Sequence, residues 1–184
     1  MPRVTAGQVK NFQLKVPPDT TRPLTDRIKI SIFDTLNPII NKSKCLDLYA
    51  GSGAFGIEAI SRGASYCHFV ESDPTAANIL NENLSNSGLN GKTSVHQIDV
   101  YDFLQKGKGL FFDIIFADPP FPDKDKLDIL KYIHDFLNVD GVFVFRYPKN
   151  EKSPEKIEVE GKLTLEKLFE KKYGKSIVSF YKKA

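Results

Sequence analysis

Short apolar runs alternate with amphipathic stretches along most of the chain, and this pattern sets the first expectations. The apolar runs are five or six residues long, as in buried strands, and lie at residues 44–49, 66–71, 93–98, 113–117 and 141–145. The amphipathic stretches are bounded by proline or glycine, as helices are, and lie at residues 54–62, 74–87 and 126–137. This alternation predicts an α/β protein whose parallel sheet carries helices on both faces.

The beginning of the chain departs from this alternation. Residues 3–16 alternate loosely around one glycine and predict a short basic β-hairpin, which a proline-containing connector follows. A helix is then predicted from Thr25, with Pro38 ending it. We therefore divide the chain into an N-terminal extension, residues 1–24, and one α/β domain, residues 25–184.

The end of the chain allows two interpretations. Residues 162–183 can form two strands joined by a turn at residues 173–175, or they can contain a helix over residues 165–172. We prefer the two strands.

A glycine-rich sequence, GSGAFG, follows the first predicted strand and opens the next helix. Gly51, Gly53 and Gly56 fit the G-x-G-x-x-G pattern, in which glycine allows a tight turn and a close approach of the backbone to a ligand. Glu71 ends the second predicted strand 20 residues after Gly51, where a carboxylate can accept hydrogen bonds from both hydroxyls of a ribose. The combination predicts a nucleoside cofactor; glycines that only allow close helix packing are the structural alternative.

Asp47 distinguishes between two cofactors that suit this geometry. A nicotinamide dinucleotide needs a pyrophosphate site at the helix N-terminus, and a nearby carboxylate would repel it. S-adenosylmethionine instead carries an ammonium group that a carboxylate would attract, so we predict S-adenosylmethionine. In the alternative interpretation, Asp47 caps backbone amides of the loop itself. The predicted cofactor-binding residues are Asp47, Ala50, Gly51, Ser52, Gly53, Glu71, Ser72, Asp99 and Val100.

Two interpretations of Asp99 stay open. It follows the third predicted strand, where an adenine would lie, and its carboxylate could accept a hydrogen bond from the adenine amino group. It could equally be the N-cap of a short helix over residues 100–104.

The sequence Asp118-Pro119-Pro120-Phe121 follows an apolar strand and should face the same edge of the sheet as the glycine loop. An exocyclic base amine is a poor nucleophile, because its lone pair is conjugated into the ring. A carboxylate and a backbone carbonyl that accept both N–H bonds turn the lone pair outward and stabilise the charge that develops on nitrogen. The prolines would fix these acceptors, and Phe121 would stack on the base. These four residues are the predicted catalytic residues; a strand-ending turn with a buried phenylalanine is the structural alternative.

Composition narrows the class of protein. The chain has 184 residues, of which 41% are apolar, enough for one domain with a sizeable core. Two cysteines and three histidines outside ligand spacing indicate neither a disulfide framework nor a metal site, so we expect no metal. No apolar run approaches the roughly 20 residues of a membrane helix and no secretory signal opens the chain, so we expect a cytoplasmic protein.

Charge is distributed unevenly along the chain. Residues 1–29 carry six Lys and Arg against two Asp and Glu, residues 30–148 carry ten against 15, and residues 149–184 carry ten against six. Basic ends around an acidic middle suggest a polyanionic partner. Solvated lysines are the alternative interpretation, and we favour it for the C-terminal end, where no motif accompanies the charge.

Several stretches together resemble a known family. LDLYAGSGAFGIEAISRGA, FVE and FADPPF resemble class I S-adenosylmethionine-dependent methyltransferases that act on exocyclic base amines. RVTAGQVKNFQL and RPLTDRIKISIFDTL resemble the N-terminal signature of the RsmD family, bacterial guanine-N2 methyltransferases of small-subunit ribosomal RNA. The ending KKYGKSIVSFYKK is similar to that family's close, so the resemblance spans nearly the whole chain. Residues 22–27 are its most selective part.

The resemblance implies a Rossmann-like fold, with a seven-stranded mixed sheet that ends in an antiparallel hairpin and makes residues 25–184 a methyltransferase domain. It implies Glu71 at the ribose, Asp99 near the adenine, and Asp118 to Phe121 around the target base. The implied partner is ribosomal RNA or the small-subunit ribonucleoprotein particle. The residues expected to hold that RNA are Arg3, Lys10, Arg22, Thr25, Asp26 and Arg27.

The expected reaction is methylation of N2 of a guanine in 16S ribosomal RNA by a monomeric enzyme. Methylation of adenine N6 in DNA or RNA is the nearest alternative, since DPPF serves both bases. Three residues depart from the family pattern: Phe121 where tyrosine is frequent, Asp34 where asparagine is common, and Arg146 where an acid is common. They bear on the choice of substrate more than on the chemistry.

Overall fold

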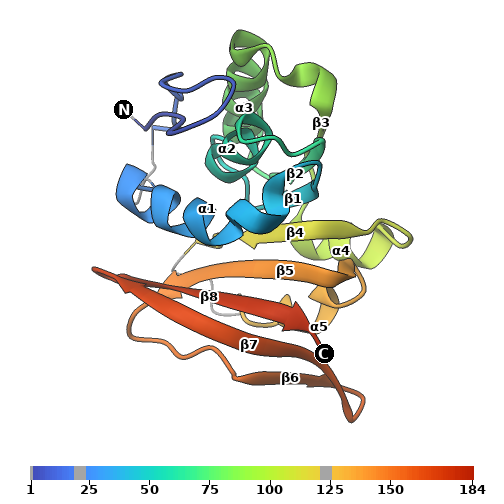
Figure 1. Ribbon diagram of the computed structural model, residues 1–184. Helices are drawn as coiled ribbons and strands as arrows, with labels where there is room; N and C mark the ends of the chain where they lie inside the picture. The colour runs from blue at the N-terminus through green and yellow to red at the C-terminus, as the bar shows by residue number, and fades with distance from the viewer. Residues whose placement is uncertain (1, 19–23, 121–125) are drawn as a thin grey trace.

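The described residues form one sheet of eight strands (Figure 1). The computed structural model describes residues 2–18, 24–120 and 126–184. Within them, the order of the strands is β3-β2-β1-β4-β5-β8-β7-β6. The strands are β1 (Lys44–Leu48), β2 (Tyr66–Val70), β3 (Thr93–His96), β4 (Phe112–Ala117), β5 (Leu137–Pro148), β6 (Lys156–Val159), β7 (Lys162–Tyr173) and β8 (Ser176–Lys183).

The first five strands in this order run parallel, and the last three are antiparallel to their neighbours. The order reverses between β1 and β4, which pair from Cys45 opposite Ile114 to Leu48 opposite Ala117. Ligands of open α/β sheets bind at such a switch point, beyond the carboxyl ends of the strands. The structure therefore brings the glycine loop after β1 beside the segment that follows β4.

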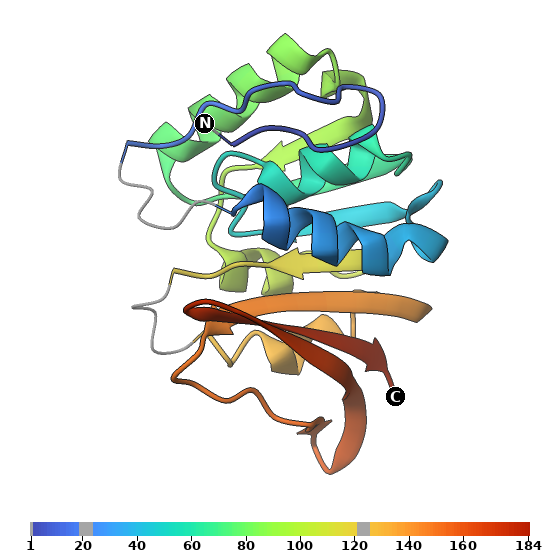
Figure 2. The same cartoon turned by 60° about the vertical axis from the view of Figure 1, so that its left-hand side comes forward.

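Helices cover both faces of the parallel strands (Figures 1 and 2). On one face lie α1 (Asp26–Ile40), α2 (Ala54–Ser61) and α3 (Pro74–Ser87), followed by the 3-10 turn η1 (Asn90–Lys92), and on the other lie α4 (Val100–Lys106) and α5 (Leu130–Ile133). Each face has its own apolar core, because alternate side chains of a strand point to opposite faces. Among the described helices, none combines the length and the apolar character needed to cross a bilayer.

The predicted α/β architecture with helices on both faces is confirmed. The helix predicted at residues 74–87 is α3, which Asp73 caps at its start and Gly88, at φ 71°, caps at its end. The two C-terminal strands are confirmed as well: β7 and β8 form an antiparallel hairpin, and the alternative helix over residues 165–172 is wrong. The patterns that succeeded are those set by local caps and turns.

The predicted count of seven strands is wrong, because β6 adds an eighth. This strand is only four residues long, and a tight turn through Glu160 (φ 51°) and Gly161 (φ 76°) returns it to β7. Positive φ at both turn residues matches the twist of a two-residue hairpin. The strand exists because β7 supplies its hydrogen-bonding partners, and its own sequence is too short and too polar to signal it.

Two helix boundaries also differ from the prediction. The helix expected over residues 126–137 contains only α5, because Leu137 already pairs with Phe112 and so begins β5. Pro38 does not end α1, which continues to Ile40. Proline costs a helix one backbone hydrogen bond, but burial of Ile40, 3% exposed, favours continuing the last turn into the core.

The N-terminal segment folds back on α2 rather than forming a regular hairpin. One bridge joins Arg3 and Gln13, shorter than the hairpin predicted over residues 3–16. Gly7 packs so closely that a Cβ would lie 1.8 Å from Ser61 O, and its φ of 85° also requires glycine. The turn therefore bonds to α2 instead of extending its own strands. The boundary at residue 24 stays a prediction.

Two histidines on neighbouring strands form a hydrogen-bonded pair. His68 Nδ1 and His96 Nε2 are 2.9 Å apart, with the rings stacked at an interplanar angle of 7°. One nitrogen must donate and the other accept, so the bond requires an unprotonated acceptor. Burial lowers the pKa of both side chains, and the neighbouring His96 lowers that of His68 further.

We expect the free energy of unfolding to fall as the pH is lowered from 7.5 to 5.5. An unfolded histidine has a pKa of about 6.5, whereas the folded values are lower, so in this range the unfolded chain binds more protons. Urea unfolding at several pH values measures the effect. The His96→Gln variant should show a shallower fall, and equal pH dependence in both proteins would contradict the assignment to this pair.

Candidate active site

The loop after β1 has the backbone shape that its glycines predict. The chain turns through positive φ at Tyr49 (58°), Gly51 (54°) and Gly53 (82°), and Gly53 is the N-cap of α2. The φ of Gly53 favours glycine, and a Cβ there would also lie 2.5 Å from Leu80 Cδ1, so that leucine would have to move. A Cβ on Gly51 would meet no described atom within 4 Å, so this residue borders open space.

Glu71 lies where the ribose-binding carboxylate is expected, directly after β2. Its Oε2 accepts from Gly51 N at 2.8 Å, and its Oε1 accepts from Asp73 N at 2.9 Å. These two N–H groups fix the carboxylate between the glycine loop and the start of α3. A carboxylate oxygen has a second lone pair, so each can still accept a hydrogen bond from a ribose hydroxyl.

Asn83 supports the glycine loop and was missed by the sequence reasoning. This α3 side chain, 1% exposed, donates to the carbonyls of Ser52 and Lys15, each at 2.9 Å. Its Oδ1 accepts from Lys15 N at 3.0 Å, so it joins the N-terminal segment to the loop. Its only signal in the sequence is an amide among the apolar positions of α3, beside Leu84.

Asp47 lies beneath the loop, where it is 1% exposed. Its Oδ2 accepts from Gly56 N at 2.9 Å, which is the backbone-capping role left open by the sequence. Burial raises the pKa of Asp47 well above its ordinary value, the Gly56 N–H opposes that rise, and the charges of Asp118 and Glu71 add to it. Three carboxylates therefore converge at this end of the sheet.

Asp99 is the N-cap of α4, one of the two roles considered for it. Its Oδ1 accepts from Tyr101 N at 2.8 Å and from Asp102 N at 3.3 Å. The pairing of Glu71 N with His96 O, at 3.1 Å, places the end of β3 beside Glu71, so Asp99 lies at the same edge of the sheet. The other predicted cofactor residues near these carboxylates are the buried Ala50 and Val100 and the exposed Ser72.

Asp118 and Pro119 follow β4 at the switch point, and Pro120 is exposed after them. Asp118 Oδ2 accepts from Arg146 Nη1 at 2.7 Å, and the arginine side chain is only 6% exposed. Arg146 Nε also donates to Ser176 Oγ at 3.4 Å, so the first residue of β8 helps to hold the guanidinium in place. The arginine that departs from the family pattern is thus the partner of the predicted catalytic carboxylate. Phe121 lies outside the described residues.

The predicted RNA-binding residues that the structure describes do not all lie at the same end of the parallel strands. Arg3 Nε pairs with Asp26 Oδ2 at 3.0 Å, and Thr25 caps α1 by accepting from Ile28 N. Arg27 is exposed in the first turn of α1, and the start of α1 lies on the same side of the molecule as the carboxyl ends of β4 and β5 (Figure 1). The remaining two are Lys10, whose turn packs on the end of α2 farthest from the glycine loop, and Arg22, which lies outside the described residues.

The site is built from carboxylates, backbone amides and an arginine. Within the described parts of the chain, no group of three His, Cys, Asp or Glu side chains could hold a metal ion. Carboxylates at the end of a parallel sheet, beside a glycine loop, can bind a cationic nucleoside ligand and accept hydrogen bonds from an amine.

Known proteins resemble this chain in sequence and in fold. A family model described as conserved hypothetical protein 95 matches residues 2–182. YlbH of Bacillus subtilis, whose name assigns it provisionally to the rRNA methyltransferases, is 34% identical over 98% of both chains. Ribosomal RNA small subunit methyltransferase D of Haemophilus influenzae is 40% identical over 65% of this chain and 63% of its own length.

Solved structures of methyltransferases also have this fold. YhhF of Escherichia coli, described provisionally as a methyltransferase, superposes with a TM-score of 0.84 at 28% identity, covering 98% of this chain and 97% of its own. The chain therefore has the class I methyltransferase fold and belongs to the RsmD family of ribosomal RNA methyltransferases.

Proposed function

We propose that this protein transfers the methyl group of S-adenosylmethionine to N2 of a guanine in small-subunit ribosomal RNA. The observation that carries the proposal is the position of Asp118, which follows β4 beside the glycine loop and is held by Arg146. Relatives named as small-subunit enzymes support ribosomal RNA, or the particle that contains it, as the substrate. Such a substrate also favours a cytoplasmic location.

The residues around the glycine loop fit S-adenosylmethionine, which when bound supplies a methyl group already activated on a sulfonium. Glu71 would accept from the ribose, and Asp99 could accept from the adenine amino group with Oδ2 while Oδ1 caps α4. A cation near Asp47 would offset the unfavourable burial of its charge. The acidic surroundings suit a methyl donor that is itself positively charged, and the proposed reaction needs no metal.

The residues after β4 fit the acceptor. Asp118 and a backbone carbonyl of the double proline would accept both N–H bonds of the exocyclic amine. The Arg146 guanidinium, 2.7 Å from Asp118 Oδ2, fixes the orientation of the carboxylate before the base arrives. Two fixed acceptors hold the nitrogen lone pair out of the ring plane and pointing to the methyl donor.

Methyl transfer can be tested with isotopically labelled S-adenosylmethionine. The chain is incubated separately with naked 16S ribosomal RNA, purified small ribosomal subunits and DNA, and the nucleosides are then analysed. We expect label in N2-methylguanosine from one of the two ribosomal substrates. Label in N6-methyladenosine would instead establish adenine as the target, and no label in any substrate would contradict the proposal.

Glu71→Gln should raise the dissociation constant for S-adenosylmethionine by about 10- to 100-fold. An amide can keep only one of the two backbone N–H bonds and would point an NH₂ group at Gly51 N or Asp73 N. Hydrogen bonds to a charged group are worth about 1.5–3 kcal/mol. Calorimetry in the presence of EDTA measures the affinity, with Glu82→Gln on the exposed surface of α3 as the control. Equal affinities for the two variants would exclude Glu71 from the cofactor site.

A further inference from the structure

Three exposed lysines, Lys149, Lys152 and Lys175, lie at the edge of the sheet that carries Asp118. Their sequence positions suggested only a solvated C-terminal surface. The antiparallel hairpin changes this, because β8 starts where β5 ends: Pro148 pairs with Ser176, and Lys149 N donates to Lys175 O at 2.9 Å. The turn between β7 and β8 is thereby brought to the carboxyl ends of the parallel strands.

The register fixes how far these lysines lie from the candidate catalytic carboxylate. Ala117 on β4 is opposite Phe145 on β5, so Asp118 is level with Arg146. Lys149 follows Arg146 by three residues, about 10 Å along an extended chain. That distance is short enough for an RNA strand to contact the lysines while one of its bases reaches Asp118.

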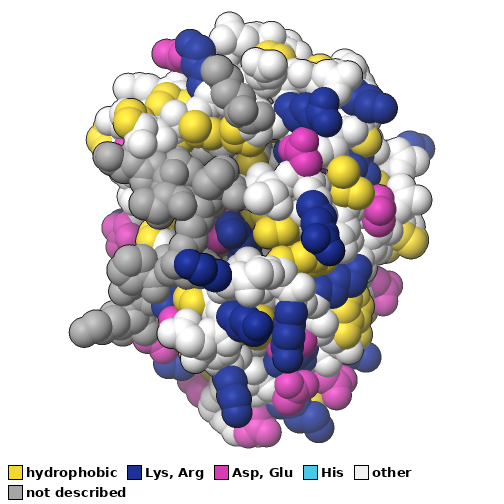
Figure 3. All heavy atoms as spheres, turned by 90° about the vertical axis from the view of Figure 1, so that its left-hand side faces the viewer, with side chains coloured by type: hydrophobic (Ala, Val, Ile, Leu, Met, Phe, Trp, Pro, Cys, Tyr) yellow, Lys and Arg dark blue, Asp and Glu magenta, His cyan; other side chains and the backbone are white. Residues whose placement is uncertain are grey.

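The hairpin also joins these lysines to the first helix. Tyr173 OH and Ser31 Oγ are 2.6 Å apart, and Lys171 Nζ donates to Thr35 Oγ1 at 2.7 Å. Arg27 lies one turn before Ser31 on α1. Exposed cations thus extend from α1 across the β7–β8 turn to the chain after β5. Figure 3 views this side of the molecule and shows Lys and Arg side chains spread over it, with Asp and Glu side chains among them.

Four of these cations form no ion pair with another described residue: Arg27, Lys149, Lys152 and Lys175. The one acid within the segment from Lys149 to Lys152 is Glu151, whose Oε1 is 2.9 Å from Lys126 Nζ and is therefore already paired. The four positive charges can therefore bind a polyanion. The four cations lie beside an active site for a nucleobase, which favours RNA over an anionic membrane, because a membrane surface would not deliver a base to Asp118.

We propose that Arg27, Lys149, Lys152 and Lys175 form a second RNA-binding surface, which holds backbone phosphates next to the target base. The proposal rests on the proposed function and adds to it the part of the RNA that this face recognises. Phosphate contacts position a nucleic acid without reading its sequence, so the surface sets affinity and register while the pocket at Asp118 selects the base.

The test compares the triple variant Lys149→Gln, Lys152→Gln, Lys175→Gln with a matched control, Lys44→Gln, Lys108→Gln, Lys162→Gln. The control lysines are also exposed, but they lie at the amino ends of the parallel strands. Binding to naked 16S ribosomal RNA and to small subunits is measured at several salt concentrations. We expect the triple variant to bind at least 10-fold more weakly and its salt slope to fall by about 2, since each phosphate contact contributes roughly 0.7–0.9.

The control variant should retain wild-type affinity and slope, and both variants should keep the wild-type melting temperature and affinity for S-adenosylmethionine. An unchanged salt slope in the triple variant would overturn the proposal. So would a variant that loses binding to phosphatidylserine vesicles but not to RNA. The salt dependence of RNA affinity does not depend on methyl transfer. A wild-type protein that binds RNA without methylating it would therefore contradict the proposed function but not this RNA-binding surface.

Discussion

Asp118→Asn is expected to lower the rate of methyl transfer at saturating substrates by at least 10²- to 10³-fold. Asparagine keeps one acceptor but loses the charge that stabilises the positive nitrogen as it forms, and loss of one preorganised electrostatic contact typically costs that much. It also removes the ion pair with Arg146 Nη1, at 2.7 Å, that orients the side chain. Single-turnover kinetics with labelled S-adenosylmethionine measure the rate.

Affinity for S-adenosylmethionine separates this role from a structural one. Asp118 touches the acceptor in the proposed arrangement, so the dissociation constant of the cofactor should change by less than about threefold, well under 1.4 kcal/mol. Asp113→Asn makes the same change at the other end of β4, where that carboxylate accepts from Lys44 N at 2.8 Å, and should leave the rate near wild type. Equal losses of rate and cofactor affinity in Asp118→Asn would refute the assignment.

Local signals in the sequence predicted most of the fold. Pro74 and Gly88 mark the two ends of α3, and both boundaries are correct because a cap acts through its own backbone. The errors concern segments whose state depends on a distant partner. β6 is a strand because β7 lies beside it, and β5 begins at Leu137 because that residue pairs with Phe112. Tertiary pairing overrides local propensity at such positions.

Residues of the candidate site could be predicted where their place at the end of a strand determines their position in the fold. Glu71 and Asp118 each follow a parallel strand, so their presence at one edge follows from the topology. The contacts of Asn83 and Arg146 could not be predicted, because they join residues 28 to 68 positions apart on other elements. Arg146 illustrates the limit: in the sequence it is a departure from a family pattern, and only the pairing of β4 with β5 shows that it faces Asp118.

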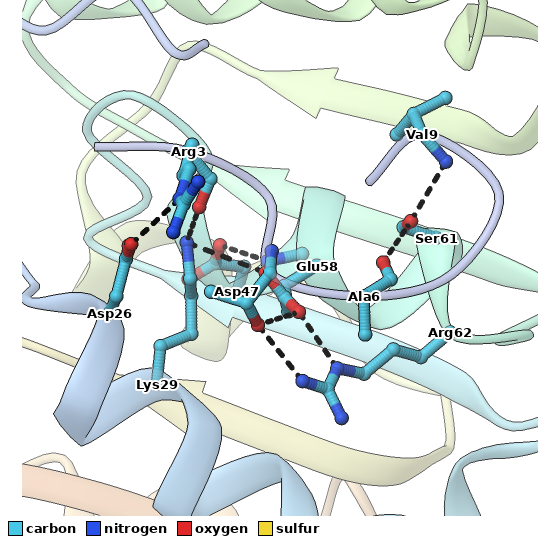
Figure 4. Close-up of polar contacts among 11 residues, drawn as sticks. Arg3, Ala6, Val9, Asp26, Lys29, Asp47, Glu58, Ser61 and Arg62 are labelled. Atoms are coloured by element: carbon cyan, nitrogen blue, oxygen red, sulfur yellow. Dashed lines mark hydrogen bonds and ion pairs between the residues drawn. The ribbon is translucent and has the colours of Figure 1, made fainter. Parts of the chain in front are cut away.

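A buried ion cluster fastens the N-terminal segment to the domain (Figure 4). Glu58 and Lys29 have side chains that are 0% exposed, with Glu58 Oε2 3.4 Å from Lys29 Nζ. Glu58 Oε1 also accepts from Arg62 Nε at 2.7 Å and from Thr5 Oγ1 at 2.6 Å, and Lys29 donates to the carbonyl of Arg3. Burial lowers the pKa of Lys29, and the charge of Glu58 opposes that change. The lysine therefore depends on this carboxylate for its charge.

Glu58→Ala should accordingly lower the free energy of unfolding by about 3–5 kcal/mol, measured by urea denaturation. Removal of one partner leaves an uncompensated charge in the core, and the burial penalty of that charge then falls on the folded state alone. Glu82→Ala is the matched control, since its pair with Lys15 is about half exposed and should contribute less than about 1 kcal/mol. The double variant Lys29→Met, Glu58→Leu should recover part of the loss, because it also removes the fully buried lysine charge, although Arg62 and Thr5 still lose their carboxylate partner. A loss in Glu58→Ala no larger than in Glu82→Ala would mean that the N-terminal segment is held by its apolar contacts instead.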